Sequence, residues 1–228
     1  MSYAELPSRL ARVRETIAQH QQAGGWTHPV RIIGVVKTHP PEAVRAAVAA
    51  GLEAVGENRV QEALAKMAVV GEAPIAWHLV GTLQRNKVRQ IVGRFAMLHA
   101  VDRPELVAEL GRRIPPAAPQ AVLLEVNCAG ESAKAGVTPE ELPSLLDAAA
   151  ACPSLRVEGL MTMAPFTDDV AVQRAVFQRL RELRDQAERR GFRLPHLSMG
   201  MSGDYAAAVE QGATMVRLGT VLFGERVA

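Results

Sequence analysis

Cysteine is scarce in this sequence. The two cysteines, Cys128 and Cys152, do not have the spacing of metal ligands and stand among aliphatic residues. This context favours reduced, buried thiols over a disulfide framework. We therefore assign neither cysteine any chemistry, and we identify no metal site.

A strong excess of charge of one sign is also lacking. The sequence contains 26 lysines and arginines against 24 aspartates and glutamates, a formal net charge of +2. Such a small charge gives no long-range field that would favour binding to nucleic acid or to a membrane surface. We expect the partner to be a small molecule.

Long hydrophobic runs are missing as well. No apolar stretch approaches the roughly 20 residues that span a bilayer. The first ten residues, which include Glu5 and Pro7, lack the apolar run of a secretion signal. These features predict a cytoplasmic protein.

What the sequence does have is enough apolar material for one substantial core. It is 228 residues long and 48% hydrophobic, close to the usual size of an undivided α/β barrel. The proline-rich patch at 114–119 is short enough to be a loop. We expect a single domain over residues 1–228.

Short apolar runs alternate with helical patterns along the chain, which is typical of a parallel sheet. The predicted strands cover residues 30–36, 52–56, 75–80, 95–101, 121–126, 157–161, 194–199 and 214–218. An amphipathic helix over residues 3–22 precedes them. About eight strand–helix units in so short a chain favour a (β/α)8 TIM barrel with an extra N-terminal helix over an open doubly wound sheet.

Polar residues at the carboxyl ends of barrel strands are the first candidates for a site, because loops at that end carry the chemistry of such barrels. Lys37 directly follows the first apolar run, RIIGVV. Burial there would lower the pKa of its amine, and a neutral amine can attack an aldehyde. The alternative is a lysine that only extends from the strand end to solvent.

Two late loops have the composition of phosphate-binding loops. In the first, small residues around Ser202 and Gly203 allow close approach of an anion, and Ser202 adds a hydroxyl. In the second, Gly219 and Thr220 follow the last predicted strand. Each loop alone fits a plain turn, but together they favour a phosphate site.

Arg217 stands in an otherwise apolar run, and its permanent charge is costly to bury without a polar partner. A heterocyclic nitrogen would be such a partner, and an arginine beside a pyridine nitrogen would keep that nitrogen unprotonated. An ion pair with Glu57 or Glu225 is the structural alternative.

Seven motifs occur in a fixed order: VVKTHP, GENRVQEA, WHLVGTLQRNK, ESAKAG, GLMTMAP, LSMGMSGDYAAAV and VRLGTVLFGER. From about Arg31 to Arg226 the chain resembles the pyridoxal-phosphate homeostasis protein family, also called the YggS or proline-synthetase-co-transcribed family. The resemblance implies a barrel of PLP fold type III, similar to the amino-terminal domain of alanine racemase, that binds pyridoxal 5′-phosphate (PLP).

The resemblance also implies roles for individual residues. Lys37 would hold PLP as a Schiff base, Arg217 would face the pyridine nitrogen, and the phosphate would be bound by three residues of the late loops: Ser202, Gly219 and Thr220. Asn58 and His78 would line the pocket near the ring. Asn58 fits a helix cap as well, and His78 fits a core histidine.

Four further positions are less directly implicated. Lys134 matches a lysine that the resemblance places near the cofactor entrance, although on the sequence alone it is an exposed loop lysine. Met161 and Met163 would pack over the site or fill the core. Val36 departs from the family, since many relatives have a small or hydroxylated residue before the lysine.

The resemblance implies a protein that stores, masks and delivers PLP, with PLP-dependent apoenzymes as further partners and no catalytic residue of its own. The first alternative is a PLP-dependent amino-acid racemase, which needs a second proton-transfer group opposite Lys37. The second is a lysine-dependent aldolase acting on a sugar phosphate.

The sequence offers little for racemase chemistry. Alanine racemases take their second proton-transfer group, a tyrosine, from an additional domain of a partner subunit. The two tyrosines of this chain, Tyr3 and Tyr205, stand near predicted helix starts. For the assembly we expect a monomer in which the opening helix covers the amino-terminal end of the barrel, a dimer contact through that helix being the alternative.

Overall fold

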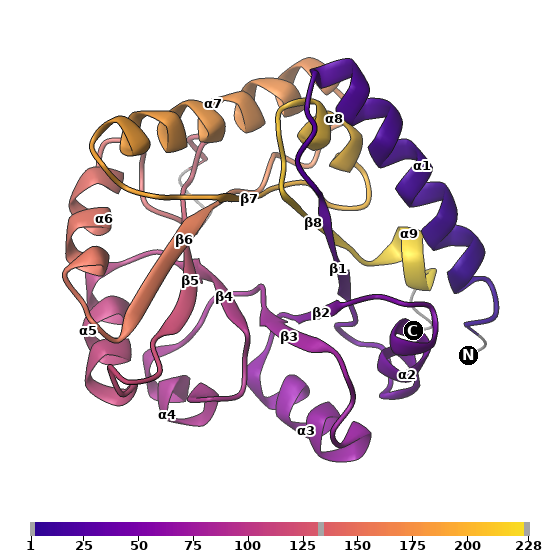
Figure 1. Ribbon diagram of the computed structural model, residues 1–228, viewed down its shortest axis with the longest axis horizontal. Helices are drawn as coiled ribbons and strands as arrows, with labels where there is room; N and C mark the ends of the chain where they lie inside the picture. Colours follow the sequence, from indigo (N-terminus) through magenta and orange to yellow (C-terminus); the bar gives the residue numbers. More distant parts are fainter. Residues whose placement is uncertain (1–2, 132–134, 226–228) are drawn as a thin grey trace.

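The alternation of apolar runs and helical segments builds a closed barrel in the computed structural model, which describes residues 3–131 and 135–225. Over these residues, eight strands pair in parallel in chain order, and β8 pairs with β1 (Figure 1). The strands are β1 (Arg31–Val35), β2 (Ala54–Glu57), β3 (Ala76–Leu79), β4 (Met97–Val101), β5 (Gln120–Glu125), β6 (Leu155–Met161), β7 (His196–Ser198) and β8 (Met215–Leu218). Each strand overlaps a predicted apolar run, so the (β/α)8 barrel is confirmed and the open doubly wound sheet is wrong.

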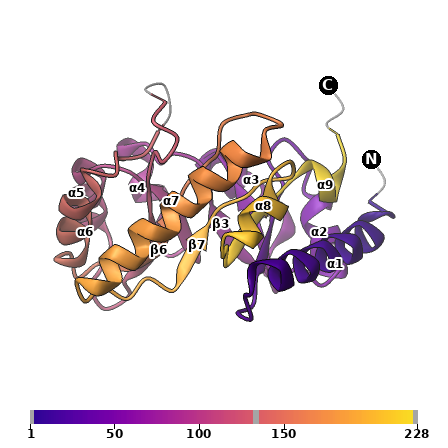
Figure 2. The same cartoon turned by 90° about the horizontal axis from the view of Figure 1, so that it is seen from above.

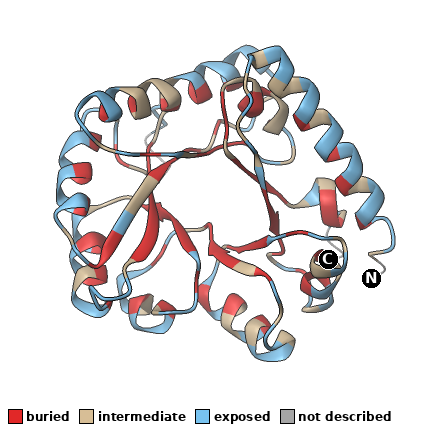
Figure 3. Ribbon diagram, in the orientation of Figure 1, coloured by how far each residue is buried: buried red, intermediate tan, exposed pale blue. Residues whose placement is uncertain are grey.

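Helices surround the barrel and turn their apolar sides toward it, as the buried inner faces show (Figure 3). They are α2 (Glu42–Ala49), α3 (Val60–Val70), η1 (Arg85–Lys87), α4 (Val88–Ile91), α5 (Pro104–Arg113), α6 (Leu142–Ala150), α7 (Val170–Arg189), α8 (Tyr205–Glu210) and α9 (Thr220–Phe223). No helix in the described part of the chain is long and apolar enough to cross a membrane.

The extra N-terminal helix, α1 (Leu6–Gly24), is present as predicted, but its expected position was wrong. It buries Leu6, Leu10, Val13 and Ile17, which lie on one helical face. This face packs against the outer wall of the barrel beside α8 and α9 (Figure 1) instead of covering its amino-terminal end. The reason is that α9 has only four residues, so α1 supplies the apolar cover that a full last helix would give.

The barrel interior is packed by residues that alternate along the strands with outward-facing ones. Ile33 and Val35 of β1 belong to one small interior cluster, and Ala121 and Leu123 of β5 belong to another. Polar side chains enter this interior toward the carboxyl ends of the strands. The loops at that end include the one after β6, which rises above α7 in Figure 2.

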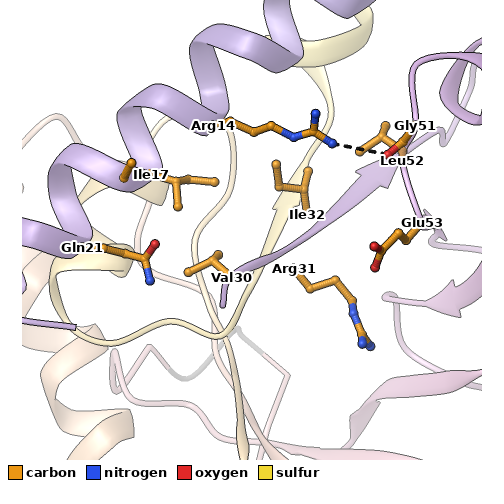
Figure 4. A pocket seen from close by; sticks show the side chains of 10 residues that line it. Arg14, Ile17, Gln21, Val30, Arg31, Ile32, Gly51, Leu52 and Glu53 are labelled. Carbon is orange, nitrogen blue, oxygen red and sulfur yellow. Dashed lines mark hydrogen bonds between the residues drawn. The ribbon is translucent and has the colours of Figure 1, made fainter. Parts of the chain in front are cut away.

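A separate cavity of about 200 Å³ lies beside the other, amino-terminal ends of the strands (Figure 4). It is formed by α1 and by the residues that begin β1 and precede β2, and Arg14 donates a 3.3 Å hydrogen bond to the Gly51 carbonyl at its rim. Its lining mixes arginines, a glutamate and aliphatic side chains. Because it lies away from the strand ends that carry Lys37, it is not part of the site described below.

Candidate functional site

The segment that carries Lys37 is a tight turn directly after β1. Lys37 itself is half-buried, and Thr38 has a φ of 65°. This left-handed conformation is strained for a β-branched residue, and strain of this kind is found most often at functional sites. The turn is anchored by His39, whose buried ring lies against Tyr3 and Phe223.

A buried ion pair supports this turn from the outside of the barrel. Lys66 of α3 pairs with Glu57, the last residue of β2, and its Nζ also donates a 2.6 Å hydrogen bond to the carbonyl of Val36. Glu57 is fully buried, and burial raises the pKa of its carboxyl while the bond to Lys66 opposes that rise. The pair thus joins the ends of two neighbouring strands at the residue before Lys37.

The two loops predicted to bind phosphate meet in space. Ser202 Oγ accepts hydrogen bonds from the backbone N–H groups of Gly219, at 3.2 Å, and Val221, at 3.3 Å. Thr220 lies between these two donors and is exposed. A Cβ at Gly219 would meet only Val35, with its carbonyl oxygen at 3.5 Å and its Cβ at 3.8 Å, so Gly219 borders open space. The Ser202 hydroxyl, which keeps its own proton to donate, and the backbone beside it therefore fit an anionic group.

Arg217 is buried in the barrel interior and bound to two neighbouring strand ends. Its Nη1 donates to the carbonyl and the hydroxyl of Ser198, at 2.8 and 2.7 Å, and its Nη2 donates to the Thr162 carbonyl at 2.9 Å. These bonds use three of the five guanidinium N–H donors. Glu57 pairs with Lys66, so the structure gives no support to an Arg217–Glu57 ion pair.

Two buried histidines continue the hydrogen-bond network from Arg217. Ser198 Oγ lies 2.9 Å from His99 Nδ1, and His99 Nε2 lies 2.8 Å from His78 Nδ1. Arg217 can only donate to Ser198 Oγ, so the Ser198 hydroxyl is free to donate its proton to His99 Nδ1. In that arrangement His99 carries its proton on Nε2 and donates it to His78 Nδ1, and His78 is protonated on Nε2 as well. Burial lowers the pKa of His78 to about 4 and holds that of His99 well below its usual value, so both rings are neutral near pH 7.

His78 and Asn58, both predicted to line the pocket near the ring, differ in how deeply they are buried. His78 is fully buried beneath the strand ends and lies next to His99. Asn58 is half-buried directly after β2. It is not the N-cap of α3, which is Arg59, so the capping alternative is wrong. The loop after β3 packs closely on Asn58, since a Cβ at Gly81 would lie 2.4 Å from the Asn58 carbonyl oxygen.

A buried carboxyl group lies on the far side of the barrel mouth. Glu125 ends β5, is 2% exposed, and its Oε2 has no hydrogen-bond partner among the described residues. Burial raises the pKa of Glu125 to about 7; the negative charge of Asp102 adds to the rise and the positive charge of Arg217 opposes it. The carboxyl is therefore close to half-protonated near neutral pH.

The pKa of Glu125 predicts a pH-dependent stability. Between its ordinary pKa of 4.5 and about 7, the folded state binds more protons here than the unfolded state, so stability falls as pH rises across this window. The full effect is about 3 kcal/mol at most. We expect Glu125→Gln to raise the free energy of unfolding of the cofactor-free protein at pH 8 by about 1 to 3 kcal/mol, and to change it little near pH 4.5.

Urea titrations at both pH values would measure this difference. His78 has the opposite pH dependence below pH 6.5, because its pKa is lowered. The variant must therefore be compared with the wild type at each pH. An equal difference at both pH values would show that Glu125 does not titrate in this window.

The methionines and cysteines noted in the sequence have structural roles. Met161 is a fully buried member of the barrel interior, and Met163 packs beside it. Cys128 and Cys152 are free and half-buried, and burial raises the pKa of the Cys128 thiol to about 11, so it stays protonated. Lys134 lies outside the described residues.

Sequence reasoning gave no role in the site to Lys66, His99, Glu125 or Asp102. A charged or polar residue within an apolar strand or at its end was the signal available for the last three, as it was for Arg217. No such signal exists for Lys66, because a lysine in a helical pattern is normally exposed.

Comparison with known proteins places the chain in one family. The family model described as "Alanine racemase, N-terminal domain" matches residues 9–227. The pyridoxal phosphate homeostasis protein of Aquifex aeolicus is 43% identical over 221 residues, covering 96% of this chain and 97% of the relative. The protein of the same name from Pseudomonas aeruginosa is 45% identical over 217 residues, covering 95% and 92%.

Solved structures agree with this grouping. PipY of Synechococcus elongatus, solved with PLP bound, is 35% identical with a TM-score of 0.83, covering 96% of this chain and 100% of that one. Alanine racemase from Corynebacterium glutamicum is 21% identical with a TM-score of 0.73, covering 92% of this chain and 60% of the enzyme, so it shows the fold alone. The chain belongs to the pyridoxal phosphate homeostasis protein family, whose barrel is that of the alanine racemase N-terminal domain.

Proposed function

We propose that this protein binds PLP and serves in its intracellular homeostasis by storing, masking and delivering it. The observation that carries the proposal is the convergence, at one end of the barrel, of an amine, an anion-binding pair of loops and a buried arginine. Lys37, Ser202 with Gly219, and Arg217 all lie at the carboxyl ends of neighbouring strands. The relatives are named for PLP homeostasis, and PipY was solved with PLP bound.

The residues present fit this cofactor. PLP supplies an aldehyde that condenses with the Lys37 amine, with loss of one water, into a Schiff base that masks it. Ser202, Gly219 and Thr220 would hold the phosphate, with the Ser202 hydroxyl as a donor whose oxygen is fixed by the N–H groups of Gly219 and Val221. Two N–H donors of Arg217 remain beyond its bonds to Ser198 and Thr162, and one of them would face the pyridine nitrogen. Asn58 and His78 would complete the wall near the ring.

The test of this proposal is the visible spectrum of the purified protein. Addition of PLP should produce a violet-absorbing band, and borohydride should then fix one cofactor per chain, as mass spectrometry would show. If PLP leaves the spectrum equal to that of free PLP, the cofactor assignment fails. A lysine-dependent aldolase would then become the better hypothesis. Arg217 argues against it, because an aldolase binds no heterocycle whose nitrogen would need a cation.

We propose that the protein is not a racemase. Racemisation needs a second proton-transfer group opposite Lys37. Tyr205 begins α8, and the Tyr3 hydroxyl lies 3.2 Å from His39 Nδ1 on the α1 side of the barrel. Neither tyrosine comes from the strands opposite β1.

We therefore expect purified PLP-loaded protein to convert L-alanine or L-serine to the other enantiomer no faster than free PLP does. Chiral chromatography after long incubation would measure this. Turnover above the free-cofactor rate, lost in Lys37→Ala, would show that the protein is an enzyme.

We also propose that residues 1–228 form a single domain that acts in the cytoplasm as a monomer and passes PLP to dependent apoenzymes. The match of one family model to residues 9–227 supports the single domain. Gel filtration would measure the assembly without affecting the other assignments.

A further inference from the structure

The mouth of the barrel has an acidic side that the proposed binding of PLP does not use. Side chains along a strand point alternately to its two faces, so Ala121, Leu123 and Glu125 of β5 share one face. Ala121 and Leu123 belong to the interior cluster, so the Glu125 carboxyl points into the barrel. It is 2% exposed, and its Oε2 is without a hydrogen-bond partner in the described part of the chain. A buried polar atom left unsatisfied in this way commonly marks a site that a ligand or water completes.

A second carboxyl group lies beside Glu125. Asp102 directly follows β4, the neighbour of β5, and its negative charge acts on Glu125. Asp102 itself forms an ion pair with the adjacent Arg103 at the edge of the barrel. Arg217 is the positive group of the interior whose charge reaches Glu125, and its guanidinium is bound to Ser198 and Thr162. We call Asp102 and Glu125 the acidic wall.

The acidic wall lies across the barrel mouth from Lys37. In the closed order β1 to β8, β5 is four strands away from β1 in either direction, and Figure 1 shows the two strands on opposite sides of the ring. The anion-binding loops after β7 and β8 lie on the Lys37 side. The mouth is therefore electrically polarised, with donors for an anion on one side and the carboxyl groups of buried Glu125 and half-buried Asp102 on the other.

We propose that the acidic wall selects the molecule that takes the cofactor from Lys37, admitting a primary amine through its ammonium group and disfavouring one that carries a carboxylate. This inference rests on the proposed function. A free amino acid would bring its carboxylate toward Asp102 and Glu125, and like charges brought together in a buried site repel strongly. A lysine side chain of a receiving polypeptide has an ammonium group and no adjacent carboxylate. It is the acceptor class that this wall fits.

The exchange is balanced without any further reagent. The amine nitrogen bonds to the cofactor's aldehyde carbon while the bond from that carbon to Lys37 Nζ breaks. Two amine hydrogens end on Nζ, which leaves Lys37 as a neutral amine. The additional proton of the incoming ammonium passes to Glu125 at its unpartnered oxygen. Asp102 contributes its negative charge beside Glu125 and takes up no proton in this step.

L-alaninamide and L-alanine are the probes that test this selectivity, because they differ only in the carboxylate. Each is added to PLP-loaded protein at equal concentrations of its ammonium form. Because the exchanged Schiff base keeps the violet band, the rate at which Lys37 is released is measured by quenching samples with borohydride and following the loss of cofactor-modified chain by mass spectrometry. We expect the wild type to react at least about tenfold faster with alaninamide. In Glu125→Gln the ratio should fall to about threefold or less, mainly through a faster reaction with alanine.

Two further variants make the result decisive. Asp102→Asn should lower the ratio in the same direction, which keeps the test open if Glu125→Gln folds poorly. Glu105→Gln, which removes an exposed carboxylate of α5, should leave it unchanged. A wild-type ratio near one, or a ratio unaffected by Glu125→Gln and Asp102→Asn, would overturn the inference. Failure of the wild type to form any band would instead overturn the proposed function.

Discussion

Lys37→Ala is expected to abolish the violet-absorbing band and the fixation of PLP by borohydride. The substitution removes the amine that would form the covalent link, while the phosphate-side residues Ser202, Gly219 and Thr220 remain. Weak, reversible binding with the spectrum of the free aldehyde should therefore persist. Because Lys37 is half-buried in a turn and not part of the core, the free energy of unfolding should change by less than about 1 kcal/mol.

Lys87→Ala is the matched control for this experiment. Lys87 belongs to the short helix η1 after β3 and lies outside the proposed site. The Lys87→Ala variant should bind PLP and show the wild-type band. After reduction with borohydride, the peptide that carries the cofactor should contain Lys37. A band of normal intensity in Lys37→Ala would assign the cofactor to another lysine, and peptide mapping would identify it.

The fold was predictable from the sequence because its signals are local and repeated. Each strand is a short apolar run, and in a parallel sheet covered by helices the runs need no alternation to be recognised. Eight such runs in a chain of this length leave little choice except closure. The extent of α1 was predictable for the same reason, from Leu6, Leu10, Val13 and Ile17 on one face.

The position of α1 was not predictable, because it depends on what another element lacks. The last helix, α9, has four residues, and the stretch after Gly219 does not itself reveal that the barrel wall is uncovered there.

The site was predictable where polar residues interrupt apolar strand ends, as at Lys37 and Arg217. The partners of those residues come from distant parts of the chain and carry no such mark. Ser198 and Thr162 bind Arg217 across 19 and 55 residues of sequence, and Lys66 reaches Val36 from the second β/α unit. These contacts depend on strand register and barrel closure, which only the folded structure fixes.

Lys66→Met is expected to lower the free energy of unfolding by about 3 to 5 kcal/mol, a large part of the stability of an ordinary domain. The Lys66 side chain is 9% exposed and that of Glu57 is fully buried, with Glu57 Oε2 already without a partner among the described residues. Removal of the ammonium leaves an uncompensated buried carboxylate. It also takes from the Val36 carbonyl, next to Lys37, one of its two donors, the other being the His39 N–H at 3.1 Å. The turn that carries Lys37 should loosen, so formation of the PLP band should also slow.

Urea unfolding at pH 7 measures the first effect, and stopped-flow absorbance measures the second. The double variant Lys66→Met/Glu57→Leu also removes the buried carboxylate, so the stability should recover by at least about 2 kcal/mol. Band formation should stay slow, because the Val36 carbonyl still lacks its bond from Lys66 and keeps only the His39 N–H as donor. Arg59→Met breaks an exposed pair with Glu62 on the same helix and should cost less than about 1 kcal/mol. A loss in Lys66→Met no larger than that control would mean that the buried pair contributes little. A double variant that recovers both stability and the rate of band formation would mean that the pair only stabilises the fold and does not position Lys37.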